Sequence, residues 1–274
     1  TRKALRSEVG PDGQWLLERL QEEATPAVLR QLPEVQTLRT VWRQQFEVVE
    51  EQVRFRPPGP YDGTSQIATP HDPEARYSKK REQSWVGDKL QVTETDDEGY
   101  PHLITDIAMT SSVETDMVAL DSSQARLKAR DLLPREQLGD AGYISGPNLA
   151  QSQQRGIDLI GPAPSVQSPQ SRLPDGLTQD QFCVDWETNT ARCPGGQTSN
   201  HGIRHSHGGT QFRFKTVACK ACPLHSRCCT GKRGRSININ PHWRVLQEAR
   251  ARQETQAFKA IYRKHRGGVE GCLS

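Results

Sequence analysis

The stretch EQLGDAGYISGPNLAQSQQRGIDLIGP, residues 136–162, decides the fold class of this chain. A short apolar run is followed by a turn at Gly139–Tyr143, by a helix-forming segment, and by the second apolar run IDLI. This order predicts a strand, a turn, a helix and another strand. A helix that crosses from one strand to a further strand is typical of α/β sheets.

Further short runs upstream complete the expected sheet. SQIAT (65–69), KLQVTET (89–95) and HLITDIAMT (102–110) have strand character, and the turn residues DDEGYP (96–101) between the last two predict an antiparallel hairpin. Residues 113–134 predict a helix. We therefore expect an α/β fold with a mixed sheet and flanking helices.

The remaining segments give a four-part organisation. Residues 1–56 are expected to be a helical N-terminal region, shorter than a complete one, and residues 57–162 the first part of the α/β core. Residues 163–240 form a cysteine-rich insertion that begins with an exposed Pro/Ser/Gln-rich linker (163–176). Residues 241–274 contain one long basic helix (242–265).

Charge is distributed unevenly along the 274 residues. Lys and Arg total 36 and Asp and Glu 33, yet residues 201–274 hold 15 basic and 3 acidic side chains. A basic third on an acidic body fits either a polyanion such as DNA or a solvated basic surface. No run of 18 apolar residues is present, so we expect no membrane partner and a cytoplasmic protein, which would be nucleoid-associated if its partner is DNA.

The cysteine-rich insertion has the spacing of a metal site. Cys219 and Cys222 form a C-x2-C turn, Cys193 lies upstream, and Cys228 or Cys229 would complete a four-thiolate zinc site. The substitutes for one cysteine are His201, His205, His207 and His225. The segment has few apolar residues, so zinc would stabilise its fold. An iron–sulfur cluster, redox thiols or no metal at all remain open alternatives.

Three acidic residues stand out from the many that are expected on the surface. Asp140 lies where an apolar strand ends, Glu270 stands alone in the basic segment RGGVEG, and Asp72 precedes a dense Arg/Lys run. The structural alternative for each is a turn, a helix cap or an ion pair.

The order of several motifs resembles a known family. TPHDPEARYSKKREQSWVGDKLQVTET, PHLITDIAMT, LLPREQLGDAGYISGPNLAQSQQRGIDLIGP, FCVDWETNTARCPGG, CKACPLHSRCCT and RKHRGGVEGCLS occur in the order seen in DDE-class transposases of bacterial insertion sequences. The resemblance is to the subgroup with a cysteine-containing insertion before the last acid, and it runs from about residue 38 to the end.

The resemblance implies an RNase H-like fold, a metal-dependent DNA strand cleavage and transfer activity, and a catalytic site of three acids that hold two Mg²⁺ ions. Asp140 matches the second acid and Glu270 the third, while Asp72 is the first choice for the first acid and Asp62 its competitor. Arg263, Lys264 and Arg266 are expected to contact DNA phosphates. A homodimer on DNA is also implied.

Departures from the family pattern leave the activity of this chain open. Asp88 stands where an aromatic residue is usual, and Gly139 where a β-branched residue would favour a strand. An inactive copy is therefore one reading. The alternative function is a non-catalytic, zinc-stapled nucleic-acid-binding protein.

Overall fold

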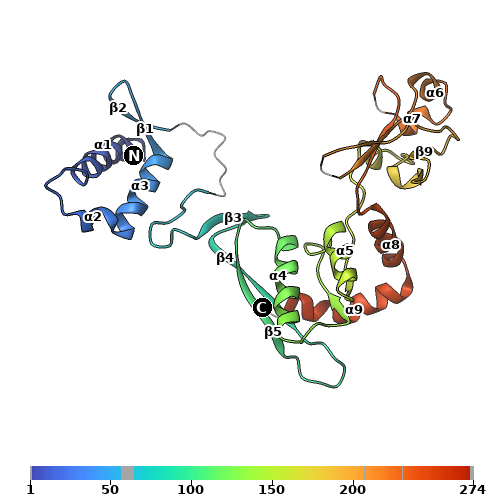
Figure 1. The fold of residues 1–274 in the computed structure, drawn as a ribbon, viewed down its shortest axis with the longest axis horizontal. Helices are drawn as coiled ribbons and strands as arrows, with labels where there is room; N and C mark the ends of the chain where they lie inside the picture. Colours follow the sequence, from blue (N-terminus) through green and yellow to red (C-terminus); the bar gives the residue numbers. More distant parts are fainter. Residues whose placement is uncertain (1, 57–64, 207, 230, 272–274) are drawn as a thin grey trace. The chain divides into compact units, whose positions relative to one another are not determined.

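The computed structural model describes residues 2–56, 65–206, 208–229 and 231–271, with the side chains of 2–5 and 268–271 excluded (Figure 1). The chain divides into two compact units. The first contains residues 1–94 and 104–115, and the second contains residues 95–103 and 116–274. Within the described ranges, no helix combines the length and the apolar character that crossing a membrane requires.

The first unit begins with helices and ends its N-terminal part in a hairpin. Helices α1 (Arg2–Arg19), α2 (Ala27–Gln31) and α3 (Pro33–Gln45) are followed by strands β1 (Phe46–Val49) and β2 (Gln52–Phe55). The prediction of helix up to residue 56 is therefore wrong for 46–55. Glu50 and Glu51 adopt positive φ angles of 51° and 64°, the geometry of a tight hairpin turn between β-branched and aromatic strand residues.

A three-stranded antiparallel sheet makes up the rest of the first unit. Strands β3 (Arg76–Lys80), β4 (Gln83–Glu94) and β5 (Ile104–Ser111) pair in that order, with Leu90 opposite Met109. The predicted hairpin is confirmed, and β3 is an addition to it. The predicted strand at 65–69 is wrong: its only pairing among the described residues is the isolated bridge of Thr69 with Asp72, because Pro70 and Pro73 interrupt the ladder.

The second unit contains the crossover that the opening stretch predicts. Helix α4 (Asp116–Ala129) leads to strand β6 (Glu136–Leu138), helix α5 (Gly146–Gln154) and strand β7 (Asp158–Ile160), and β6 pairs with β7 in parallel. Ser145 caps α5 by accepting a hydrogen bond from the Asn148 N–H at 3.2 Å. These elements are confirmed, and they enclose an apolar cluster of Leu120, Ile144, Leu159 and Ala163.

The cysteine-rich segment folds around its own apolar core. Strands β8 (Cys183–Asp185) and β9 (Thr190–Arg192) form a hairpin, and β10 (Ile203–Arg204), β11 (Thr210–Arg213) and β12 (Ser236–Ile239) form a small sheet. Two short helices, α6 (Thr216–Lys220) and α7 (His225–Cys228), carry cysteines. Its buried apolar residues form one core, which Trp243 of the following helix completes: Phe182, Ala191, Phe212, Phe214, Ile237, Ile239 and Trp243. The stabilising role of zinc stays a prediction.

The segment 163–176 is more ordered than an exposed linker. It contains the 3₁₀ helix η1 (Pro169–Arg172), and a second one, η2 (Gln179–Gln181), follows. Ala163 is buried and Gln170 is 2% exposed. The linker prediction is therefore wrong at these two positions, because the Pro- and Ser-rich composition conceals residues that pack inward.

The C-terminal helix is interrupted. Helix α8 (Trp243–Gln253) ends before α9 (Gln256–Gly271), so the prediction of one helix over 242–265 is wrong. Thr255 accepts a hydrogen bond from the Phe258 N–H at 3.2 Å, as an N-cap does, and this favours a new helix start.

The chain is thus a mixed α/β protein, as predicted. The strands of the described residues form five separate sheets of two or three strands. The RNase H-like arrangement and the four-part division of the chain stay predictions.

Candidate active site and cysteine cluster

Asp140 lies at the carboxyl end of β6, where the sequence predicts it. Pairing with β7 continues one residue past the strand through the Gly139 N–H, which donates to the Ile160 carbonyl at 3.0 Å. The Asp140 carboxylate then turns back and accepts a hydrogen bond from the Gly142 N–H at 2.7 Å. The half-buried acid is therefore held at the edge of the parallel pair.

A second carboxylate lies beside Asp140. A methyl group added at Gly142 would be 2.9 Å from Oδ1 of Asp140 and 2.9 Å from Oδ2 of Asp116, the first residue of α4. Burial, together with the negative charges of Asp116 and Asp140, raises the pKa of Tyr143 to about 12. The absence of a side chain at Gly142 lets two carboxylates and a phenol converge.

Helix α9, which contains Glu270, packs beside β6, the strand that leads to Asp140. The side chain of Glu270 lies outside the described ones. Its helix nonetheless belongs to the same compact unit as Asp140.

Asp72 belongs to the first compact unit, whereas Asp140 and Glu270 belong to the second. Its Oδ1 accepts hydrogen bonds from the backbone N–H groups of Glu74 at 3.2 Å and Ala75 at 3.1 Å. This is the turn-capping role given above as the structural alternative. Asp62, the competing first acid, lies outside the described residues.

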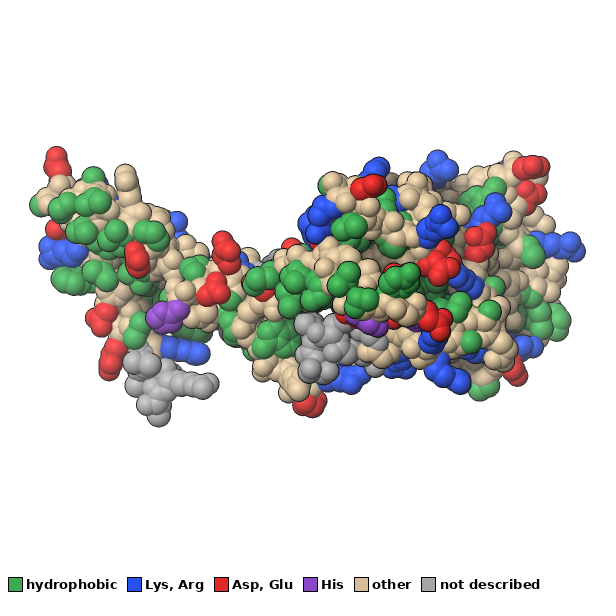
Figure 2. Space-filling view, turned by 90° about the horizontal axis from the view of Figure 1, so that it is seen from below, with side chains coloured by type: hydrophobic (Ala, Val, Ile, Leu, Met, Phe, Trp, Pro, Cys, Tyr) green, Lys and Arg blue, Asp and Glu red, His purple; other side chains and the backbone are tan. Residues whose placement is uncertain are grey.

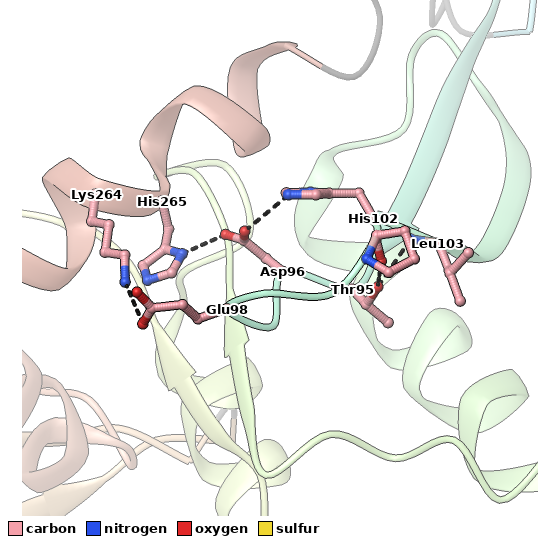
Figure 3. Close-up of polar contacts among 8 residues, drawn as sticks. Thr95, Asp96, Glu98, His102, Leu103, Lys264 and His265 are labelled. Atoms are coloured by element: carbon pink, nitrogen blue, oxygen red, sulfur yellow. Dashed lines mark hydrogen bonds and ion pairs between the residues drawn. The ribbon is translucent and has the colours of Figure 1, made fainter.

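An acid that the sequence reasoning did not select lies against α9. Asp96 comes two residues after β4, and its carboxylate contacts Nδ1 of His265 and lies 3.5 Å from Nε2 of His102 (Figure 3). Glu98 pairs with Lys264 at 3.1 Å. An acid at the end of an apolar strand is the signal that selects Asp140, but the run DDEGYP (96–101) indicates only the turn of a hairpin.

The basic residues of α9 differ in their environments. Lys264, expected to contact phosphates, forms an ion pair with Glu98. The side chains of Arg263 and Arg266 are exposed, and that of Arg266 also interacts with another residue. Figure 2 shows Lys and Arg side chains mixed with Asp and Glu on the face that it displays. DNA contact by Arg263, Lys264 and Arg266 stays a prediction.

Five cysteines meet around one cavity. Its lining includes Cys193, Cys219, Cys222, Cys228 and Cys229, together with His225. A methyl group at Gly195 would lie 3.0 Å from the sulfur of Cys222 and 3.7 Å from that of Cys193. None of the six described cysteines forms a disulfide.

Backbone amides already point at two of these sulfurs. The Gln197 N–H donates to Sγ of Cys193 at 3.3 Å, and the Arg235 N–H donates to Sγ of Cys219 at 3.3 Å. Such bonds stabilise a thiolate and are typical of the outer shell of a thiolate metal site.

Two thiols of the cluster, those of Cys228 and Cys229, have raised pKa values. Burial raises the pKa of Cys228, and burial together with the neighbouring Cys228 and Cys219 raises the pKa of Cys229 to about 12. Among the residues that the structure describes, no group of three or more His, Cys, Asp or Glu side chains is arranged to hold a metal ion. Zinc binding by Cys193, Cys219, Cys222 and Cys228 stays a prediction.

Comparison with known proteins agrees with the class of protein that the acids suggest. Residues 192–274 match the family model described as "Transposase DDE domain". The resemblance to DDE-class transposases is therefore confirmed over this segment, which runs from β9 to the helix that carries Glu270. No curated protein and no solved structure matches the chain.

Proposed function

We propose that this chain is a transposase that cleaves and joins DNA strands of an insertion sequence, with Asp96, Asp140 and Glu270 as its three acids. The observation that carries this proposal is the position of α9. It packs beside β6, which leads to Asp140, and it contacts Asp96 through His265. Three acids from distant parts of the chain thus belong to elements that meet in one compact unit.

The donor set fits a hard divalent cation. Carboxylate oxygens are the ligands that Mg²⁺ prefers, and the Asp116–Asp140 pair concentrates negative charge at the end of β6. When bound there, Mg²⁺ ions supply an activated hydroxyl nucleophile and stabilise the leaving oxygen of a phosphodiester. The protein's own part is to hold the carboxylates: Gly142 donates to Asp140, and His265 holds Asp96.

The assignment of the first acid favours Asp96 over Asp72. Asp96 lies in the same unit as Asp140 and beside the helix of Glu270, whereas the Asp72 carboxylate caps its own turn. Asp72, in the other compact unit, is the alternative first acid.

We also propose a structural zinc ion in the cysteine-rich segment. The support is the convergence of five cysteines on one cavity and the two N–H···S hydrogen bonds. Tetrahedral zinc needs four ligands, so Cys193, Cys219, Cys222 and either Cys228 or Cys229 suffice. A homodimer on DNA and contacts of Arg263 and Arg266 with phosphates complete the proposal.

The test compares cleavage with metal binding. The full chain is assayed for Mg²⁺- or Mn²⁺-dependent nicking of supercoiled plasmid, and Mn²⁺ binding is measured separately by calorimetry. Asp140→Asn and Glu270→Gln should each abolish nicking and weaken Mn²⁺ binding. Mn²⁺ binding that both variants retain would refute the site. DNA binding without any nicking by the unaltered chain would instead favour the non-catalytic nucleic-acid-binding protein.

A further inference from the structure

We propose that the loop Gly231–Ser236 and the buried Gln170 form a pocket for one nucleotide of a DNA strand, with its phosphodiester group. The pocket lies outside the acidic site. The proposal rests on the proposed DNA-processing function and names a place, within the cysteine-rich segment, where the strand would be held.

The pocket is a cavity of about 370 Å³ next to the cysteine cluster. This volume is at the lower end of the range of ligand sites and suits a group of nucleotide size. Its described lining consists of Gln170, Cys228, Cys229, Gly231, Lys232, Arg233, Gly234, Arg235 and Ser236.

The charge of this lining is of one sign. Lys232, Arg233 and Arg235 contribute three cations, and no Asp or Glu is among the described lining residues. Lys232 and Arg233 are exposed, so both side chains can reach a strand that passes over the opening. Guanidinium and ammonium groups that converge without a carboxylate are the arrangement that binds phosphate.

Arg235 has a fixed position at the base of the loop. Its backbone N–H donates to Sγ of Cys219, its Nη2 donates to the Leu177 carbonyl at 3.4 Å, and its guanidinium lies 5.7 Å from the centroid of the Phe182 ring. Its Nε is buried and has no hydrogen-bond partner among the described residues. The guanidinium of Arg235 is therefore held in place by Nη2, while its Nε–H donor remains unsatisfied.

Gln170 provides the complementary acceptor. The residue is 2% exposed, and its Oε1 also has no partner among the described residues. Two residues that line this cavity thus carry a buried, unsatisfied donor and a buried, unsatisfied acceptor, and a ligand that offers both types of group would satisfy them. A nucleotide does so, because its phosphate oxygens accept and its base amino groups donate. Since both atoms are buried, we expect a small rotation of each side chain when the ligand binds.

The experiment measures DNA binding by the full chain. Fluorescence anisotropy with a labelled single-stranded oligonucleotide and its duplex is recorded over a range of salt concentrations. Lys232→Glu with Arg233→Glu should weaken binding roughly 10-fold or more and lower the salt slope by about one to two. The matched control, Lys215→Glu with Lys220→Glu, makes the same charge change on exposed lysines outside the pocket and should weaken binding much less.

Gln170→Leu gives a second, independent variant. It removes the unsatisfied acceptor, so the thermal midpoint of the free chain should stay the same or rise, while the rise in that midpoint on adding the oligonucleotide should shrink. Equal losses of affinity in the pocket and control pairs would overturn the pocket while leaving the transposase proposal intact. Displacement of the oligonucleotide by equimolar inorganic phosphate would show a free-anion site and also overturn it. A chain that binds no oligonucleotide at all would refute both proposals.

Discussion

The carboxylate of Asp96 accepts a hydrogen bond from Nδ1 of His265 and thereby joins the segment 95–103 to helix α9 (Figure 3). The two residues are 169 positions apart in the sequence. The neighbouring pair of Glu98 and Lys264 repeats the same connection. Residues 95–103 and helix α9 both belong to the second compact unit.

The choice between Asp96 and Asp72 gives the first prediction. Asp96→Asn should reduce metal-dependent nicking by about 100-fold or more, because a first acid would lose its charge. Asp72→Asn should leave nicking within a few-fold of the unaltered chain, since an amide oxygen can still cap the turn at Glu74 and Ala75. The reverse result would restore Asp72 as the first acid.

Much of the second unit could be predicted from the sequence. The apolar runs on either side of α5 and the Gly-Tyr turn are local signals, and they place Asp140 at a strand end where the structure has it. The contact of Asp96 with His265 had no local signal, because it depends on how α9 packs. Asp116 also had no local signal, because it lies near Asp140 only where Gly142 has no side chain.

The errors have physical causes as well. The hairpin 46–55 follows a helix without a Pro or Gly break, and its turn uses two glutamates at positive φ, which sequence patterns rarely indicate. The break between α8 and α9 depends on a single cap at Thr255 in an otherwise helix-forming run. Where a helix ends and a hairpin begins depends here on tertiary packing rather than on the helix or strand propensity of single residues.

Gly142 provides the second prediction. Gly142→Ala should place a methyl group against the carboxylates of Asp116 and Asp140, lower stability by about 1 kcal/mol and weaken Mn²⁺ binding. Gly267→Ala is the control: it lies in α9 with nothing within 4 Å, so the better helix former should raise stability by about 0.5–1 kcal/mol. Calorimetric unfolding and Mn²⁺ titration measure both effects. Unchanged Mn²⁺ affinity in Gly142→Ala would argue against a metal at this strand end.

Tyr143 reports on the charge of the acidic site. Its pKa is raised from 10.0 to about 12, first by burial and then by Asp116 and Asp140, so the folded state favours the neutral phenol. This contribution to stability is fully present below pH 10 and is lost as the pH rises through about 12. Asp140→Asn should move the phenol pKa down, towards 10.

The measurement for Tyr143 is an ultraviolet titration of phenolate, with Tyr143→Phe to identify its signal among the tyrosines. The addition of Mn²⁺ should shift the same pKa downward, since a cation beside Asp140 offsets the negative charge. A phenol pKa that responds neither to Asp140→Asn nor to Mn²⁺ would mean that burial alone sets it.

The cysteine cluster gives the last prediction. We expect one zinc ion per chain, and we expect its affinity to rise with pH, because thiols with raised pKa values, such as Cys228 and Cys229, must lose protons to bind it. Cys219→Ser and Cys222→Ser should each lose the ion and lower the thermal midpoint. Cys183→Ser changes an exposed thiol that does not line the cavity and should keep the ion. Elemental analysis of Cys228→Ser and Cys229→Ser then identifies the fourth ligand. The variant that contains no zinc is the one whose substituted cysteine binds the ion. Full zinc content in Cys219→Ser and Cys222→Ser would exclude a thiolate site at this cluster.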